Sequence, residues 1–187
     1  MATSKRVQTL LLLAFFVCVF AHRFPALGAH PLLGAEKLTK VHFFLHDTLS
    51  GSKPSAVLVA HRENHTGVPN DPTPFGTTFV IDDPLTAGPE LDSGVVGNAQ
   101  GLYVSSGQGP LSLVLGVDFE LTAGPYSGSS FVVFSRNPVT EPHRELAVVG
   151  GRGAFRLARG FAQLRTHYLN TTNGDAVIEY DVTLLHY

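Results

Sequence analysis

The chain has one cysteine, Cys18, and no tryptophan among its 187 residues. Cys18 lies in an N-terminal segment that we expect to be removed. The mature protein then has no thiol to act as a nucleophile, to bind a metal as thiolate or to form a disulfide. Its fold must depend on a closed hydrophobic core, on self-association, or on both.

Charged residues are also scarce, at 15% of the chain, and the formal net charge of −2 excludes a strongly nucleic-acid-binding surface. Apolar residues make up 44% of the chain, which is enough for a packed core and argues against disorder. No stretch of the mature chain shows a convincing helical period.

The N-terminus has the pattern of a secretory signal. Lys5 and Arg6 precede the apolar run Leu10–Ala21, which is too short to span a bilayer. Cleavage after Ala21 or after Ala29 fits the pattern, and we place it after Ala29; an uncleaved anchor is the alternative. We therefore expect a signal peptide at 1–29, a flexible lead-in at 30–39 and one domain at 40–187, without a membrane segment after processing.

Alternating apolar residues and glycine-rich turns indicate an antiparallel β-sandwich or β-barrel. Leu111–Leu121 alternates strictly, and Asp83–Ser93 is expected to be a long loop. Arg144–Gly160 is expected to be a hairpin with its turn at Gly150–Gly153, because glycine adopts positive φ at little cost. Some strands are apolar on both faces, as a barrel wall covered by a partner subunit would be.

The candidate chemistry is limited. His42 and His46 share a strand face, but no third ligand is placed by sequence, so we expect no metal site. No Gly-x-Ser-x-Gly elbow is present. Four aspartates interrupt apolar or glycine-containing segments, and one that is buried in a barrel mouth would have a raised pKa and could act as a general acid: Asp47, Asp82, Asp83 and Asp118.

Two further side chains are candidates for a ligand pocket. Tyr103 stands on a strand rich in small residues, and Arg144 stands at the entrance of the arginine-rich hairpin. The alternative for Tyr103 is a role in core packing, and the alternative for Arg144 is a structural ion pair. Asn64 and Asn170 begin Asn-x-Thr sequons and are expected to be glycosylated.

Taken together, six segments in order along Lys40–Tyr187 resemble the plant dirigent proteins. They are FFLHDTLSG (Phe43–Gly51), FGTTFVIDDPLTAGPE (Phe75–Glu90), VVGNAQGLYVSS (Val95–Ser106), GSSFVVFSRNPV (Gly128–Val139), RELAVVGGRGAFRLARG (Arg144–Gly160) and GDAVIEYDVTLLHY (Gly174–Tyr187). The chain resembles the dirigent-like subgroup in two respects: it has no cysteine in the mature part, and it has the segment SRNPV.

The resemblance implies an all-β, eight-stranded antiparallel barrel of the allene-oxide-cyclase-like kind. It also implies secretion to the apoplast, N-glycosylation and assembly as a homodimer or homotrimer. The family's pocket positions fall on Asp47, Tyr103 and Arg144, with Asp47 and Arg144 as the candidate catalytic residues. No cofactor is expected.

By this resemblance the protein would guide the stereochemistry of phenoxy-radical coupling, for example of two coniferyl alcohol units to a lignan, with radicals from a separate laccase or peroxidase. Lignan-forming members carry an Asp shortly after the RN where this chain has Pro138. Two alternatives stay open. One is a dehydratase-cyclase of the pterocarpan-synthase kind, in which Asp47 protonates a leaving hydroxyl. The other is a phenolic-binding defence or cell-wall protein.

Overall fold

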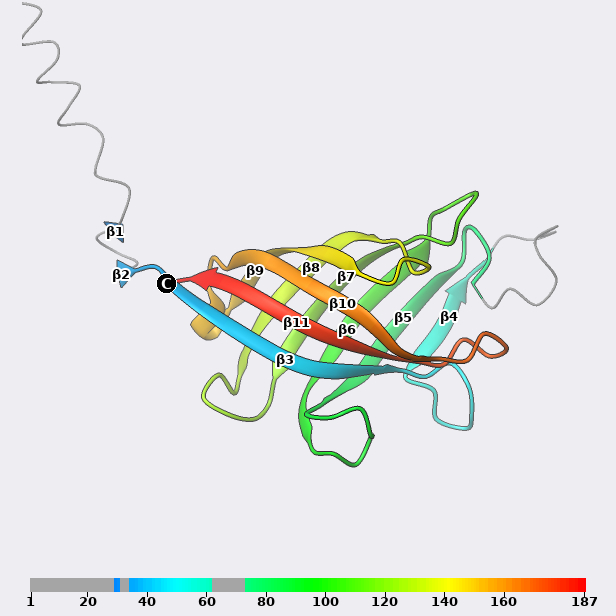
Figure 1. Cartoon of the computed structure of the whole chain (residues 1–187), viewed down its shortest axis with the longest axis horizontal. Helices are drawn as coiled ribbons and strands as arrows, with labels where there is room; N and C mark the ends of the chain where they lie inside the picture. The colour runs from blue at the N-terminus through cyan, green and yellow to red at the C-terminus, as the bar shows by residue number, and fades with distance from the viewer. Residues whose placement is uncertain (1–28, 31–33, 62–72) are drawn as a thin grey trace, which may run out of the picture. The chain divides into compact units, whose positions relative to one another are not determined.

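The computed structural model describes residues 29–30, 34–61 and 73–187. The sheet contains nine strands: β3 (Lys37–Asp47), β4 (Ala56–Ala60), β5 (Thr78–Thr86), β6 (Val95–Ser105), β7 (Leu113–Leu121), β8 (Ser129–Asn137), β9 (Arg144–Arg152), β10 (Arg159–Leu169) and β11 (Ala176–His186). All neighbouring strands are antiparallel, and the pairing of β3 with β5 closes eight of them into a barrel, with β4 beside β5 (Figure 1). This confirms the predicted eight-stranded β-barrel.

A separate two-stranded ladder pairs β1 (Ala29–His30) with β2 (Gly34–Ala35). The first barrel strand begins at Lys37, where it pairs with His186, and thus ahead of the predicted domain start at Lys40. The predicted signal peptide at 1–29 lies outside the described residues except for Ala29. Within the described parts of the chain, no helix has the length and apolar character needed to cross a membrane.

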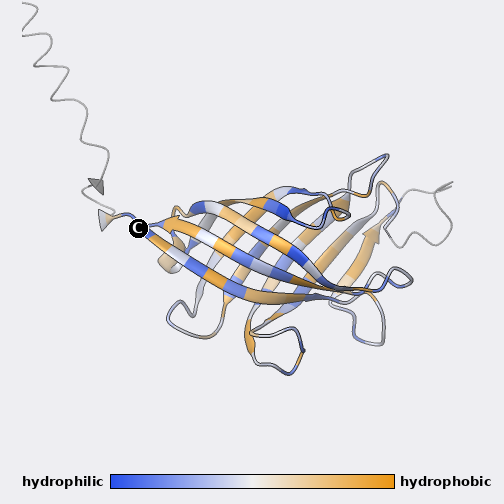
Figure 2. Cartoon of the chain, in the orientation of Figure 1, coloured by the Kyte–Doolittle hydropathy of each residue, from blue (hydrophilic) through white to orange (hydrophobic). Residues whose placement is uncertain are grey.

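Side chains alternate between the barrel interior and its outer surface along most strands, and Figure 2 shows the alternation on β10 and β11. The strict alternation predicted for Leu111–Leu121 holds from Leu115 onward, where every second side chain is buried. Period-2 patterning of this kind is what a curved sheet with one interior face requires.

Aromatic rings fill one half of the barrel. Phe119 and Phe131 stack with their ring centroids 5.2 Å apart, and Phe43 and Tyr180 stack at 5.2 Å. At the adjacent end, Phe155 packs between Tyr126 and His186, at 4.9 and 5.2 Å. Phe155 belongs to the 3₁₀ turn η1 (Gly153–Phe155). The interior at this end is therefore occupied by side chains.

The hairpin predicted at Arg144–Gly160 exists, but its turn lies elsewhere. β9 continues through Gly150 and Gly151, which pair with Val132 and Phe131 of β8, and the chain turns later, through η1. Gly151 is required there because a Cβ would lie 2.5 Å from the Phe155 carbonyl oxygen. Gly151 thus serves close packing of η1 against the strand rather than a tight turn.

Gly101 lets β6 approach β7 beside Tyr103. A Cβ on Gly101 would lie 2.2 Å from the Gly116 carbonyl oxygen and 2.8 Å from Val117 Cα, so backbone would have to move. We expect Gly101→Ala to lower the free energy of unfolding by about 3 kcal/mol. Chemical denaturation measures this, and Gly150→Ala, another strand glycine with nothing within 4 Å of the added Cβ, is the matched control. Equal stability of the two variants would contradict the crowding argument.

Candidate functional site

The other half of the barrel encloses a cavity of about 190 Å³. Its wall is mostly apolar and includes Leu45, Ile81, Leu115 and Val117, with the aromatic ring of Phe119 among the lining side chains. Strand ends converge here, because Asp47 ends β3, Asn137 ends β8 and Arg144 begins β9. A largely apolar cavity with a few inward polar groups is typical of a site for small aromatic ligands.

Asp47 extends the inward face of Phe43 and Leu45 to the end of β3 and lines the cavity. Its carboxyl group hydrogen-bonds the Tyr103 hydroxyl, while Oδ1 is buried without a partner among the described residues. Burial raises the pKa of Asp47 to about 7, and the charge of Asp175 adds to this, whereas the Tyr103 hydrogen bond opposes it. Asp47 is therefore a carboxylic acid that can hold its proton near neutral pH.

Asp83 is the second carboxyl in the cavity. Its side chain is 0% exposed, and neither carboxyl oxygen has a hydrogen-bond partner among the described residues. Burial raises the pKa of Asp83 to about 8, and the charge of Asp47 raises it further. Both aspartates also raise the pKa of Tyr103, after burial as the main cause. The described cavity thus holds two carboxyls and a phenol that favour their neutral forms.

Arg144 supplies the positive charge of the site. It is 4% exposed, its Nη2 donates to Thr166 Oγ1 at 2.8 Å and its Nη1 donates to Asn137 Oδ1 at 3.4 Å. Its Nε has no partner among the described residues, and burial lowers the pKa of the guanidinium. β9 lies across the barrel from β5 in the strand order, so Arg144 and Asp83 stand on opposite walls.

The structure brings the three predicted pocket residues, Asp47, Tyr103 and Arg144, to one cavity. Asp83 and Tyr180 also line it. The sequence offers Asp83 as a candidate acid but not as a pocket residue, and it does not select Tyr180. A signal for both existed. Tyr180 continues an inward alternation with Val182 and Leu184, and Asp83 continues that of Phe79 and Ile81, but Asp83 was placed in a loop.

The remaining strand-end aspartates lie outside the cavity. Asp82 accepts a hydrogen bond from Asn98 Nδ2 at 3.1 Å on the exposed side of β5. Asp118 lies 3.7 Å from the guanidinium of Arg152, which also pairs with Glu120 at 3.1 Å. These two acids are therefore surface groups with ordinary polar partners.

Two turns meet at the rim of the cavity. Asp175 accepts hydrogen bonds from the backbone N–H groups of Leu49 and Ser50 and from the Ser50 hydroxyl. Thr171 and Gly174, from the same turn as Asp175, line the cavity. Asn170 opens this turn, and its Oδ1 accepts a hydrogen bond from Thr172 N–H at 2.9 Å. The other sequon asparagine, Asn64, lies outside the described residues.

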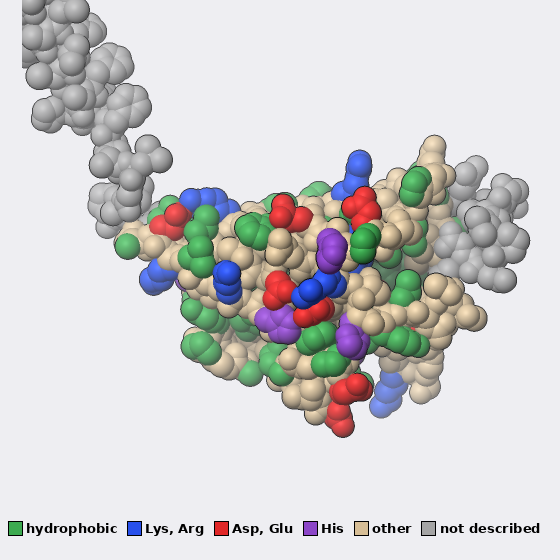
Figure 3. Space-filling model, viewed as in Figure 1, with side chains coloured by type: hydrophobic (Ala, Val, Ile, Leu, Met, Phe, Trp, Pro, Cys, Tyr) green, Lys and Arg blue, Asp and Glu red, His purple; other side chains and the backbone are tan. Residues whose placement is uncertain are grey.

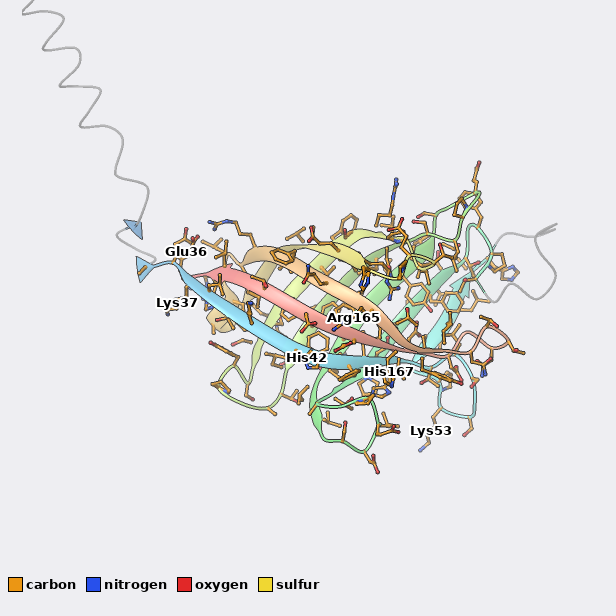
Figure 4. All side chains as sticks on the ribbon, in the orientation of Figure 1. Glu36, Lys37, His42, Lys53, Arg165 and His167 are labelled. Atoms are coloured by element: carbon orange, nitrogen blue, oxygen red, sulfur yellow. The ribbon has the colours of Figure 1, made fainter. Side chains whose placement is uncertain are left out.

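A polar cluster covers the outer face of β3, β10 and β11, where Figure 3 shows acidic, basic and histidine side chains together. His42, Glu179 and Asp181 place ligand atoms within 4.8 Å of one another. Arg165 stands beside His42 in Figure 4 and pairs with Glu179 at 3.3 Å and Asp181 at 3.6 Å. Since this guanidinium already balances both carboxylates, an ion-pair network explains the cluster without a metal.

His46 lies apart from His42. It is buried on the outer side of β3, and its Nε2 donates to Thr86 Oγ1 at 2.7 Å because the Thr86 hydroxyl donates to the Gly88 carbonyl. Burial lowers the pKa of His46. The two histidines that share a strand face in the sequence are therefore engaged by different partners.

The fold and cavity define a class of small all-β proteins whose closed barrel holds acids within an apolar pocket. Comparison with known proteins gives the family, because the dirigent-like protein family model matches residues 38–185. The chain belongs to the dirigent family. Proteins of this family are typically secreted and are associated with small phenolic ligands.

The curated relatives include both dirigent proteins and pterocarpan synthases. Dirigent protein 15 of Arabidopsis thaliana is 52% identical over 83% of each chain. Pterocarpan synthase 1 of Glycine max is 48% identical over 81% of each chain. The solved structure of the pterocarpan synthase dirigent protein GePTS1 superposes with a TM-score of 0.76 at 41% identity, covering 88% of this chain and 89% of that one.

Proposed function

We propose that the protein is a dehydratase-cyclase that acts on a phenol bearing a benzylic hydroxyl group, such as an isoflavanol. The observation that carries this proposal is the Asp47 carboxyl, whose pKa is raised to about 7 inside an apolar cavity. A general acid works best when its pKa lies near the operating pH. The similarity to pterocarpan synthases agrees with this chemistry.

In the proposed reaction Asp47 gives its proton to the benzylic hydroxyl, the C–O bond breaks and water leaves. The conjugated phenol of the substrate releases its proton to solvent, which gives a quinone methide. A second hydroxyl of the substrate then attacks the methide carbon and returns a proton to Asp47, while the methide oxygen regains its own. The net change is the loss of one water and the closure of one ring.

The cavity contributes orientation and charge. Arg144 is a buried cation with an unpartnered Nε–H, which suits it to stabilise negative charge on the phenolic oxygen as the methide forms. The apolar wall holds the ring system so that one face of the methide carbon meets the attacking hydroxyl. Product handedness would follow from this positioning.

The test is turnover of an isoflavanol by the purified protein with no oxidase present, followed by chiral chromatography. We expect loss of water and one enantiomer of the cyclised product. Denatured protein is the control for spontaneous dehydration. Recovery of unchanged isoflavanol would count against the proposal.

Stereochemical guidance of phenoxy-radical coupling is the second candidate. It is supported by the same apolar cavity and by relatives named dirigent proteins, such as Dirigent protein 15. It requires a laccase or peroxidase to make the radicals. Coniferyl alcohol and a laccase, with and without this protein, separate the two candidates, since a racemic product argues against guidance. Ligand binding without effect in either assay would leave a phenolic-binding defence or cell-wall role.

We also propose that the barrel associates with copies of itself as a homodimer or homotrimer. Val57, Val80, Leu102 and Phe134 form an outward row across β4 to β8, because Val57 pairs with Val80, Val80 with Leu102, and Gly116 with both Leu102 and Phe134. These four side chains are 43–60% exposed. A contiguous exposed apolar row of this kind is typical of a protein interface.

Phe134→Glu is expected to convert the oligomer to monomer, because a carboxylate would be buried without a partner in place of the most exposed side chain of the row. Size-exclusion chromatography with light scattering measures the mass. Leu91→Glu is the matched control, since Leu91 is 61% exposed but lies in the β5–β6 loop. An unchanged mass for Phe134→Glu would exclude this face as the interface.

We further propose that the protein is exported to the apoplast after cleavage behind Ala29 and carries N-glycans on Asn64 and Asn170. The turn position of Asn170 supports the second site. Mass spectrometry of the secreted protein gives both the mature N-terminus and the occupancy. A mature protein that begins before residue 22 would contradict the proposed processing.

A further inference from the structure

Asp47 and Asp83 each lie two residues beyond the last printed strand pair of the seam that closes the barrel, Leu45 with Leu85. β3 and β5 pair antiparallel through Phe44 with Thr86 and Leu45 with Leu85. Continuing this register by two residues sets Asp47 against Asp83, and both continue inward faces, of Leu45 and of Leu85. Residues directly opposite in an antiparallel pair are close neighbours on one face.

The seam opens at this pair of carboxyls. Pro84 has no N–H, so the ladder between β3 and β5 cannot continue past Leu85 through that residue. Beyond it, Ser55 bridges the two strands, because its N–H donates to the Thr48 carbonyl and its own carbonyl accepts from Asp82 N–H. The two aspartates thus stand where the strands separate, which leaves room for their side chains inside.

Three carboxyl oxygens at this point have no hydrogen-bond partner among the described residues: both oxygens of Asp83 and Oδ1 of Asp47. Burial and the charge of Asp47 raise the pKa of Asp83 to about 8, while the Ser55 side chain opposes this, so Asp83 favours its neutral form, which carries an O–H. The other ionisable groups of the cavity are Tyr103, which hydrogen-bonds Asp47, and Arg144 and Tyr180. Asp47 Oδ1 is the unpartnered acceptor that the extended register sets toward the Asp83 carboxyl, and the charges of the two groups interact.

We propose that Asp83 is a positioning residue for Asp47: its neutral carboxyl donates a hydrogen bond to the Asp47 carboxylate that forms when Asp47 protonates the leaving hydroxyl. This inference rests on the proposed dehydratase function. The Asp83 proton stays on Asp83; the Asp47 O–H bond and the substrate C–O bond break, and water leaves. Asp83 thereby stabilises the charged product of proton transfer without transferring a proton itself.

Two substitutions separate hydrogen bonding from ionisation. Asp83→Leu removes the donor, and we expect kcat for the isoflavanol to fall about 10- to 100-fold, as for the loss of a hydrogen bond to a charged group. Asp83→Asn keeps an N–H donor that cannot ionise, and should retain most of kcat. In the wild type, activity should fall above neutral pH with the loss of two protons; in Asp83→Asn it should fall with the loss of one. Asp82→Asn, the exposed neighbour, is the control.

A second readout is independent of activity. Carboxyl ¹³C NMR of the whole protein follows Asp47 directly, and we expect its pKa to rise in Asp83→Leu, because the ionised form loses its donor. If the wild type does not convert the isoflavanol, the proposed function is wrong, and the titration of Asp47 still decides the role of Asp83. The inference is overturned if Asp47 titrates at the same pH in wild type, Asp83→Asn and Asp83→Leu. If Asp83→Leu does not fold, the comparison of wild type with Asp83→Asn decides, by whether the two carboxyls of the wild type titrate as a coupled pair.

Discussion

Asp47→Asn is expected to lower kcat for the isoflavanol by about 10²- to 10⁴-fold, the usual contribution of a positioned general acid. Asparagine has nearly the same shape and can still hydrogen-bond the Tyr103 hydroxyl, so the cavity should keep its form. It has no proton to give to the leaving group. Steady-state kinetics gives the loss, and a direct binding measurement should show little change in affinity.

Asp82→Asn is the matched control for this substitution. It makes the same chemical change on the neighbouring strand, at an exposed position bonded to Asn98, and should leave kcat unaltered. Full activity of Asp47→Asn would remove Asp47 from the reaction. Equal losses in both variants would point to a general effect on folding.

The second large effect concerns stability, which should fall as pH rises from about 4 to 8. Burial raises the pKa values of Asp47 and Asp83 to about 7 and about 8 in the folded protein, against an ordinary value of 3.8 for an exposed aspartate. The folded state keeps both protons in this range while the unfolded state loses them, so unfolding becomes more favourable at higher pH. Each carboxyl contributes a decline of roughly 2 kcal/mol between pH 5 and pH 7, because one proton per pH unit is worth about 1.4 kcal/mol and ionisation in the folded state begins within this range.

Other groups limit this trend on the acid side. Asp175 and Glu179 have lowered pKa values, so their contribution is lost as pH falls below their ordinary range. The lowered pKa of His46 likewise makes acidification below about 6.5 unfavourable for the folded state. We therefore expect the melting temperature to be greatest in mildly acidic solution.

Thermal unfolding at fixed protein concentration, between pH 5 and pH 8, measures this dependence. Asp83→Asn should raise the melting temperature at pH 8 and change it much less at pH 5, because only the ionisable group is removed. A wild-type melting temperature that rises from pH 5 to pH 8, with the same slope in Asp83→Asn, would show that the buried carboxyls are not the source.

The strand alternation predicts an antiparallel sandwich or barrel. The resemblance to the dirigent proteins predicts the closed barrel and places Asp47, Tyr103 and Arg144 in its pocket. Asp83 stands among the candidate acids, but Asp83-Pro84 looks like the start of a loop, so the sequence does not place Asp83 in the pocket. In the structure β5 continues to Thr86 through Pro84. The N–H that Pro84 lacks would face the seam, on the same side as Asp82 N–H, where the strand needs no ladder partner. The strand tolerates this proline because of how the barrel closes, and the local sequence does not show that closure.

The hairpin turn was misplaced for a related reason. Gly150 and Gly151 have the composition of a turn, but both lie within β9, and Gly151 accommodates the close approach of η1. The approach is set by Phe155, which fills the barrel end against Tyr126 and His186. The sequence shows that glycine allows an unusual backbone conformation. Only the packed structure shows whether a turn or a close contact with a neighbouring segment requires the glycine.

The aromatic side chains around Phe155 also have a kinetic consequence. Since they occupy one end of the barrel and the cavity lies toward the other, the substrate, water and product of the proposed reaction must exchange at the cavity's own end, where Thr171 and Gly174 line it. A product molecule that has not departed then blocks the next substrate. Inhibition by product should accordingly be competitive, and turnover should respond to changes in the rim turns even where they touch no reacting atom.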